Sequence, residues 1–425
     1  MIRVVFLFLL LLSACTKSTD SFSPLAPQLV SINIIDRNGL SETISNPERL
    51  EQYYSVDFTE PQPYQKVLRI YNRDEQGNIP ACMTSYHANG CPKQYLEVSN
   101  SRACGTYREW HANGQKKIEA KIIAGHADLS AGAEKTWVFD ECSTVWDEGG
   151  TLIASIPYAK GKLDGVCLYY HANGALWKSV PFSNGVIDGT MELHYPDESL
   201  LQCTQYQRGQ KEGKSTRCWK DGVIAAEEEY SEGLLITGLY YDHESNLICK
   251  VNEGNGTRAI FGKEKVCELH EYHLGELNGE VQVFDQYDRI INRYHVKEGC
   301  KHGEEITYYD AVRLQKTLTP KLLINWYEGK VQGVCKTWYQ NGIQESQKEM
   351  SNNKKNGLHT VWYRDGSLMM IEEYQLDKLV KGEYYINGER SPVSTIIDGK
   401  GFANLYDADG NFKQKVEYCH GKPVL

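Results

Sequence analysis

Short segments of alternating hydrophobic and polar residues recur through most of this chain, and a turn signal separates each pair. From Gly165, one segment covers residues 166–171, Asn173-Gly174 follows, and a second segment covers 175–182. Alternation over six to eight residues is typical of a half-buried β-strand, and Asn-Gly between two such segments indicates a hairpin. The pattern predicts one β-hairpin per unit, with Asn and Gly in the positive-φ conformation that tight hairpin turns need.

The unit recurs with a period of about 24 residues. The glycines that open successive units are Gly165, Gly189, Gly213, Gly238, Gly279, Gly303, Gly333, Gly357 and Gly382. Such a unit cannot bury its own face and must stack on its neighbours, so we expect the glycines to allow close approach between hairpins. A helical repeat is the rival, but turn signals about every ten residues and segments rich in Tyr, Val, Thr and Trp favour strands.

The position of each residue relative to its opening glycine predicts which way its side chain faces. In one unit the second, fourth and sixth positions are Cys335, Thr337 and Tyr339, whereas odd positions such as Val334 and Lys336 are mixed. Because side chains alternate across a strand, we expect one apolar, aromatic face and one amphipathic face.

The motif Gly-x-x-x-x-aromatic-aromatic-x-Asn-Gly, closing on an aromatic residue and Gly-x-x-x-Gly, resembles the MORN repeat. It is nearest the bacterial variant found in proteins labelled as toxin–antitoxin antitoxins. The clearest matches begin at Gly165, Gly333 and Gly357, and the resemblance covers roughly residues 85–425. It implies an all-β fold, an elongated single-layer antiparallel sheet of tandem hairpins. It also implies a scaffold for protein or membrane contacts, and a fold alone does not specify function.

The first residues predict the compartment. A short basic start, an unbroken apolar run over 4–12 and the sequence Leu-Ser-Ala-Cys ending at Cys15 resemble a bacterial lipoprotein signal. The run is too short for a permanent membrane span, so we expect removal of residues 1–14 and acyl chains on Cys15 as the membrane anchor. Thr16 provides no acidic retention signal, which favours the outer membrane. Ordinary secretion with a free Cys15 is the alternative.

The remaining chain divides into three predicted parts. Residues 15–28 are expected to be a flexible tether, 29–84 an N-terminal capping region and 85–425 the tandem repeats. The capping region begins as another hairpin. Asn46 and Pro47 then predict a helix, with Asn as its cap and Pro as its first residue.

The repeat register breaks in three places: an irregular insert at residues 126–164, a shortened unit between Gly238 and Gly279, and an insert at residues 314–322. Insertions in repeat proteins map to loops on one face and can form the binding surface. The alternative is a loop that tolerates insertion and has no role.

Charge and cysteine content narrow the possible partners. The net charge is −10 and no segment is a basic block, so nucleic acid is not expected as a partner.

Of the thirteen cysteines, twelve remain when Cys15 is set aside, an even number that permits disulfides in an exported chain. We expect Cys203–Cys218 first and Cys249–Cys267 second. Elsewhere cysteine occupies inward positions, where it can simply be a small apolar residue.

The search for catalytic or metal chemistry finds no convincing group. His270 and His273 are the best metal candidates, but residues three apart on a strand face opposite sides. The carboxylate run 227–229 is expected to be solvated, and the histidine of the recurring His-Ala-Asn-Gly is expected to serve the turn. No Cys-x-x-Cys pair, nucleophile elbow or phosphate loop is present in the sequence. We therefore predict no metal, no cofactor and no enzymatic activity.

Three functions remain. The first is a lipid-anchored bacterial envelope scaffold that binds another protein through its extended β surface. The second is an antitoxin- or immunity-like inhibitor of a toxin. The third is a carbohydrate-binding or cell-wall-acting envelope protein that uses exposed indoles as stacking platforms. The candidate platforms are Trp219, Trp326, Trp338 and Trp362.

Overall fold

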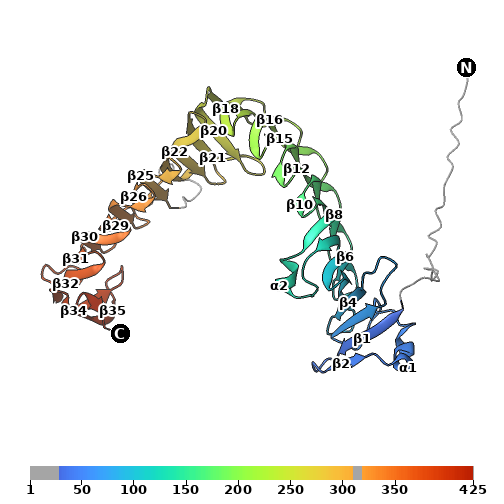
Figure 1. The fold of residues 1–425 in the computed structure, drawn as a ribbon. Coiled ribbons are helices and arrows are strands. Elements are labelled where there is room, and N and C mark those ends of the chain that lie inside the picture. Colours follow the sequence, from blue (N-terminus) through green and yellow to red (C-terminus); the bar gives the residue numbers. More distant parts are fainter. Residues whose placement is uncertain (1–27, 310–317, 425) are drawn as a thin grey trace, which may run out of the picture. The chain divides into compact units, whose positions relative to one another are not determined.

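The computed structural model describes residues 28–309 and 318–424. These residues form 36 strands of one antiparallel sheet, which confirms the predicted all-β fold class. Contacts divide the chain into two units, residues 1–164 and 165–425, which are described separately below. Within each unit most strands pair with their neighbours in the sequence, and Figure 1 shows the hairpins following one another in chain order.

Unit 1 contains the predicted N-terminal hairpin, the predicted helix and the first repeats. Its elements are β1 (Leu29–Ile35), β2 (Ser41–Ile44), α1 (Pro47–Leu50), the 3-10 turn η1 (Glu51–Tyr53), β3 (Lys66–Tyr71), β4 (Pro80–Tyr86), β5 (Pro92–Ser99), β6 (Arg102–Trp110), β7 (Lys116–Ala124), α2 (Ala131–Glu134), β8 (Val138–Trp146), β9 (Leu152–Ala159) and β10 (Lys162–Leu163).

The helix α1 begins as the sequence predicts. The Asn46 side chain accepts hydrogen bonds from the backbone N–H groups of Glu48, at 2.9 Å, and Arg49, and Pro47 is the first helical residue. The side chains of Leu50 and Phe58 then pack against β1 and β3 in a small core. This segment therefore covers one face of the first strands.

The insert after residue 125 covers the other face. Trp137 packs with Leu96, Tyr107 and Ile122 of the neighbouring strands in a second core. Side chains alternate between the two faces of a strand. In β3, Val67 therefore belongs to the first core and its neighbour Leu68 to the second, on the opposite face of the sheet. The first part of the predicted insert, residues 126–137, is thus a packed flap that adds to the core of unit 1. The prediction of an irregular segment is wrong for the rest, because residues 138–163 form the paired strands β8, β9 and β10.

Unit 2 consists of successive hairpins. Its strands are β11 (Gly165–Tyr170), β12 (Leu176–Ser183), β13 (Val186–Ile187), β14 (Gly189–His194), β15 (Leu200–Gln207), β16 (Gln210–Cys218), β17 (Ile224–Ser231), β18 (Leu234–Tyr241), β19 (Leu247–Asn252), β20 (Asn255–Phe261), β21 (Val266–His273), β22 (Glu276–Phe284), β23 (Ile290–Lys297), β24 (Cys300–Lys301), β25 (Gly303–Tyr308), β26 (Pro320–Tyr327), β27 (Lys330–Val331), β28 (Gly333–Trp338), β29 (Gln344–Ser351), β30 (Lys354–Trp362), β31 (Leu368–Gln375), β32 (Lys378–Tyr384), β33 (Ser394–Ile397), β34 (Lys400–Tyr406), β35 (Phe412–Cys419) and β36 (Lys422–Pro423).

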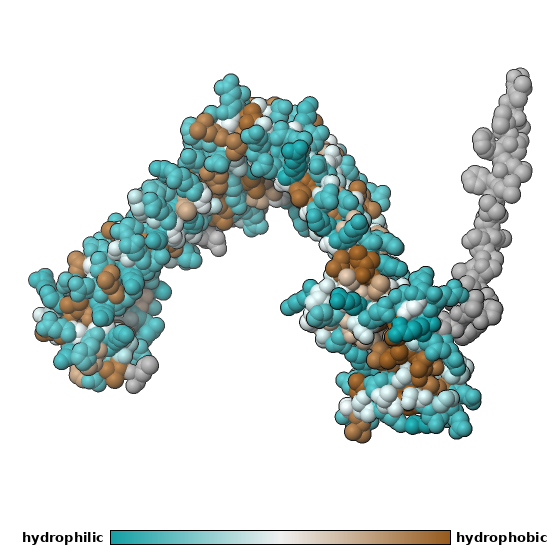
Figure 2. Space-filling model, in the orientation of Figure 1, coloured by the Kyte–Doolittle hydropathy of each residue, from teal (hydrophilic) through white to brown (hydrophobic). Residues whose placement is uncertain are grey.

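Burial follows the predicted parity. Cys335, Tyr339 and Tyr363, at the second or sixth position of their units, are buried. The described residues form separate small cores, two in each unit, because a repeat stack buries its apolar face locally. Accordingly, Figure 2 shows hydrophobic residues in separate patches on a mostly hydrophilic surface.

The prediction that both residues of the Asn-Gly turn adopt positive φ is wrong. Gly174 has φ 83°, but Asn173 does not lie in the positive region. The His171 N–H bonds to Ala175 O at 2.8 Å, as in a type I turn followed by a left-handed glycine. Turns with two positive φ values lie at the opposite edge of the sheet, for example Asn184 (51°) and Gly185 (87°).

Some of the opening glycines act as predicted, by allowing close approach between strands, whereas a Cβ at Gly303 would meet nothing. Gly357 has φ 115°, and a Cβ there would overlap the side chain of Glu349 on the preceding strand. The Glu349 carboxylate accepts the N–H of Leu358 at 3.2 Å, and Glu97 does the same for Thr106 at 2.6 Å beside the equivalent glycine of unit 1. The strand register shifts at this point, so the carboxylate satisfies a backbone group that the sheet leaves open.

Candidate functional site

Four Asn-Gly turns, at Asn89, Asn113, Asn173 and Asn341, are tied to the turn of the next hairpin. The Asn173 amide donates to Pro196 O at 2.7 Å, while its carbonyl accepts the N–H of Ala175 at 3.1 Å. The His171 ring nitrogen Nε2 lies 3.0 Å from His194 O. The same arrangement recurs at His87 with Asn89 and at His111 with Asn113. The predicted turn role of the His-Ala-Asn-Gly histidine is therefore confirmed.

Later units replace this histidine with tyrosine or tryptophan. The Tyr339 hydroxyl donates to Trp362 O at 2.7 Å. Trp219 occupies the same position, is 1% exposed, and its Nε1 has no partner among the residues that the structure describes. The proposal of Trp219 as a surface platform is wrong, because the sixth position of a unit faces inward. Trp326 and Trp338 are only partly exposed, as is Trp362.

A bulge beside each of these turns inserts one extra residue into the second strand of the hairpin. In the hairpin of β11 and β12, Tyr169 faces Lys178 and Tyr170 faces Leu176, so Trp177 is the extra residue. It is 46% exposed, and its ring lies 6.1 Å from that of His171. Trp177 is not among the stacking platforms predicted from the sequence, because the bulge is visible only once the strand register is known.

The bulge residues change character along unit 2. In chain order after Trp177 they are Leu201, Ala225, Ile248, Cys267 and Ile291, and then Lys321, Glu345, Met369 and Lys413. Ala225 is fully buried, Trp177 and Ile248 are exposed, and Leu201 and Ile291 are partly exposed, as is Met369 further along the chain. Four large apolar bulge residues, Trp177, Leu201, Ile248 and Ile291, lie in the first part of unit 2. We call these four residues the bulge strip.

Two adjoining hollows accompany the bulge strip. The larger has a volume of about 980 Å³ and the smaller about 300 Å³. Trp177 and Leu201 line the first, Ile248 lines the second, and His243 and Glu264 line both. We call them together the turn-edge groove. Both volumes lie within the range that is typical of ligand-binding sites in proteins.

The polar groups of the turn-edge groove are only partly paired. Asp221 lies 3.7 Å from His243, whose ring stacks on Trp219 with 4.1 Å between centroids. Lys220 and Lys263 also line the groove and form no ion pair within the described chain. The groove therefore combines an exposed indole, aliphatic groups and two available cations.

A buried carboxylate lies within the sheet of unit 2. Glu228 is part of the 227–229 run that was expected to be solvated, but its side chain is 6% exposed. It accepts Arg258 Nε at 2.8 Å and the hydroxyls of Tyr230 at 2.8 Å and Tyr240 at 3.0 Å. Burial raises the pKa of both tyrosines. The prediction fails for Glu228 alone, because alternation turns the central residue of the run inward.

The same arrangement recurs six periods later. Glu372 accepts the hydroxyls of Tyr374 at 2.9 Å and Tyr384 at 2.8 Å, and His359 Nδ1 lies 3.1 Å from its carboxylate. Burial alone would raise the pKa of Glu372, but hydrogen bonds from His359 and Tyr384 hold it below its ordinary value. Both carboxylates are fully engaged by protein groups, so we interpret them as parts of the scaffold.

The predicted disulfide cysteines are free thiols in this structure. Cys203 faces Thr216, so Cys218 is its diagonal neighbour, at a spacing of about 7–8 Å that exceeds disulfide geometry. Cys249 on β19 and Cys267 on β21 are separated by β20. Burial raises the pKa of Cys249 to about 12, which disfavours its reactive thiolate. Pairing stays a prediction that requires strand movement.

The histidine pair considered for metal binding is split as expected. His270 Nε2 lies 2.6 Å from Glu268, whereas His273 is exposed at the end of its strand. Over residues 28–309 and 318–424, no three His, Cys, Asp or Glu side chains are grouped closely enough to hold a metal ion.

Several predictions fall outside the described residues. These are the signal segment 1–14, the lipidated Cys15, most of the tether and part of the 314–322 insert. Among the helices of the described chain, none is long and apolar enough to cross a membrane.

Comparison with known proteins supports the repeat type. The family described as MORN repeat variant matches residues 163–184, which contain β11, the Asn173-Gly174 turn and β12. No protein of curated function matches the chain. The fold and this match together define a β-sheet scaffold of MORN-like repeats.

Two solved structures are similar at low identity. One is described as TcdB2-TccC3 without its hypervariable C-terminal region, with 11% identity and a TM-score of 0.17, covering 85% of this chain and 24% of that one. The other is a porin-like protein from Bacteroides uniformis, with 9% identity and a TM-score of 0.15, covering 57% of this chain and 94% of that one. This chain thus spans about a quarter of the first.

Proposed function

We propose that this protein is a non-enzymatic scaffold of the bacterial cell envelope, anchored through acyl chains on Cys15, that binds another protein along the turn-edge groove. The observation that carries the proposal is the bulge strip. Trp177 and Ile248 of this strip are exposed, whereas three of the four later bulge positions carry charged residues, Lys321, Glu345 and Lys413. Exposed apolar residues with a polar rim mark interaction surfaces.

Trp177 is the expected centre of the interface. It is 46% exposed and stands beside an open hollow, and tryptophan is enriched among the residues that dominate binding energy. The sheet behind it supplies a rigid support, because Asn173 and His171 bind the next turn through the bonds described above. Lys220 and Lys263 would form part of a polar rim around the apolar contact.

A second candidate is binding of an envelope glycan by the same groove. The exposed indole of Trp177 favours it, since an aromatic ring with nearby polar groups can stack on a sugar face. We propose no catalytic role for the groove.

The test is a crosslinked pull-down of the full-length protein from intact envelopes. We expect one protein to be recovered with the wild type and reduced about tenfold or more with Trp177→Ala. Tyr327→Ala is the matched control, because Tyr327 is a 55% exposed aromatic residue beside a turn at the opposite edge of the sheet. Equal recovery with Trp177→Ala and wild type would refute the proposed surface.

Two further experiments test the lipid anchor and the class of ligand separately. Cys15→Ala should release the protein from the membrane fraction, and unchanged fractionation would refute the lipid anchor. Retention on purified envelope glycan that depends on Trp177, without a protein partner, would replace protein binding by glycan binding.

A further inference from the structure

Unit 1 contains an apolar groove on its sheet face that the scaffold function does not use. Its volume is about 660 Å³, and its floor is formed by alternate residues of three neighbouring strands. These residues are Leu68 and Ile70 on β3, Ala81 and Met83 on β4, and Val98 on β5. In the strand register Leu68 faces Met83, and Ile70 faces Ala81. The floor is therefore apolar, with Leu68 and Ile70 partly exposed over the buried Ala81, Met83 and Val98.

The wall of this groove is the loop that opens the insert. The Trp137 indole donates to His126 O at 2.9 Å, and the Thr136 hydroxyl accepts the His126 N–H at 2.9 Å. Asp128 forms an ion pair with Lys66 at 2.5 Å, which ties the loop to β3. The hydrogen bond from Lys66 lowers the pKa of Asp128 to about 2. The loop is thus fixed before any ligand arrives.

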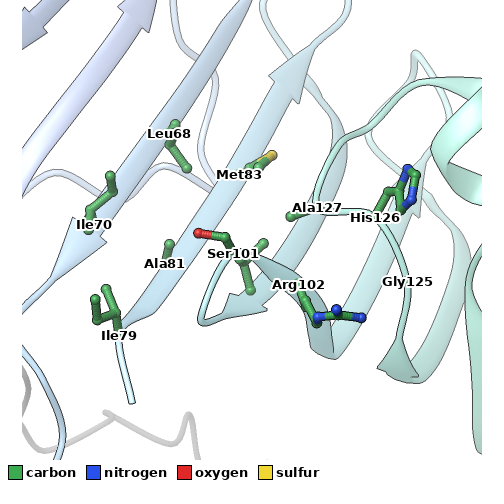
Figure 3. A pocket seen from close by; sticks show the side chains of 11 residues that line it. Leu68, Ile70, Ile79, Ala81, Met83, Ser101, Arg102, Gly125, His126 and Ala127 are labelled. Carbon is green, nitrogen blue, oxygen red and sulfur yellow. The ribbon is translucent and has the colours of Figure 1, made fainter. Parts of the chain in front are cut away.

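One cation, Arg102, stands at the mouth of the groove. Figure 3 shows Arg102 and His126 on one side of the groove and Ile70 and Ile79 on the other. The Arg102 side chain is exposed and forms no ion pair or hydrogen bond within the described chain, and arginine stays charged at any physiological pH. An unpaired guanidinium beside an apolar groove complements an anionic head joined to an apolar body.

We propose that this groove binds a long-chain fatty acid, with the acyl chain on the floor and the carboxylate at Arg102. A hydrocarbon chain suits the floor better than a peptide does. The strands β3, β4 and β5 are each paired on both sides, so no strand edge is free to accept a peptide backbone. Peptide N–H and C=O groups on this floor would lose their hydrogen bonds to water.

Binding is measured on the full-length protein with a fluorescent fatty acid and unlabelled saturated fatty acids as competitors. Affinity should rise roughly fourfold for each added methylene until the chain fills the groove. The uncharged alcohol of the same length should bind up to about fivefold more weakly. Affinity independent of chain length, equal affinity for the alcohol, or no binding at any length would overturn the proposal.

Substitutions localise the site. Ala127→Trp and Ala81→Trp should each fill the groove and lower affinity at least tenfold, and using two positions guards against a variant that fails to fold. Arg102→Gln should weaken acid binding to the level of the alcohol. The matched control is Lys93→Gln, because Lys93 is an exposed cation of the same unit outside the groove. Unchanged binding in folded Ala127→Trp would place the ligand elsewhere.

Discussion

The buried pair of Glu228 and Arg258 provides the sharpest test of how the sheet of unit 2 is held together. Arg258 Nε lies 2.8 Å from Glu228 Oε1, and the two side chains are 21% and 6% exposed. Arg258→Met would leave a buried carboxylate with only tyrosine hydroxyls as partners. Breaking a buried pair in this way destabilises by about 3–5 kcal/mol, and the partial exposure of Arg258 favours the lower figure, about 3 kcal/mol.

Hydrogen exchange is the suitable assay. Repeat hairpins open locally, so the loss should appear as a lower opening free energy for the amides of β17 and β20, while distant hairpins change little. Lys381→Met is the matched control, since Lys381 and Glu373 form an exposed pair at 3.6 Å, and we expect a change of at most about 0.5 kcal/mol.

A double variant separates the ion pair from simple loss of packing. Glu228→Gln combined with Arg258→Met removes both charges, so it should be more stable than Arg258→Met alone. The reasoning is refuted if Arg258→Met exchanges like the wild type, or if the double variant is the less stable of the two.

Three further predictions address the repeat. The ionised Glu372 stabilises the fold above about pH 4.5, the ordinary pKa of this carboxyl, and this stability is lost as the pH falls through the lower pKa of the folded state. Glu372→Gln should therefore reduce the loss of folding stability at acid pH, measured by melting curves over a series of pH values. Gly357→Ala should destabilise by about 1–3 kcal/mol through backbone strain and overlap, whereas Gly132→Ala, in open space, should stay within about 0.5 kcal/mol in the same melting assay. Asn173→Ala should cost about 1–2 kcal/mol through loss of its bond to Pro196, read as faster amide exchange in both turns.

The hairpins and their inward faces could be predicted from the sequence because their determinants are local. The glycine period, the alternation and the Asn46–Pro47 helix start all lie within a few residues of the feature that they specify. The same parity would have shown that Trp219 and Glu228 face inward, had it been applied to them.

Other features depend on contacts that no local pattern contains. The Glu228 partner Arg258 is 30 residues away, and Trp177 turns outward only because of a bulge in the strand register. The turn type was misassigned because Asn-Gly suits two kinds of hairpin loop, and the hydrogen bond between His171 and Ala175 selects the longer one. The flap over unit 1 could not be foreseen because its packing depends on strands on both sides of it in the sequence.

The most direct test of the central claim is a photo-crosslinking scan of the bulge positions in intact envelopes. A photoreactive residue is placed in turn at positions 177, 201, 248 and 291, and at the charged bulge positions 321, 345 and 413. The account predicts that a single protein is captured from the four apolar positions and not from the three charged ones. Capture from all seven positions alike, or from none, would contradict a partner-binding surface along the bulge strip.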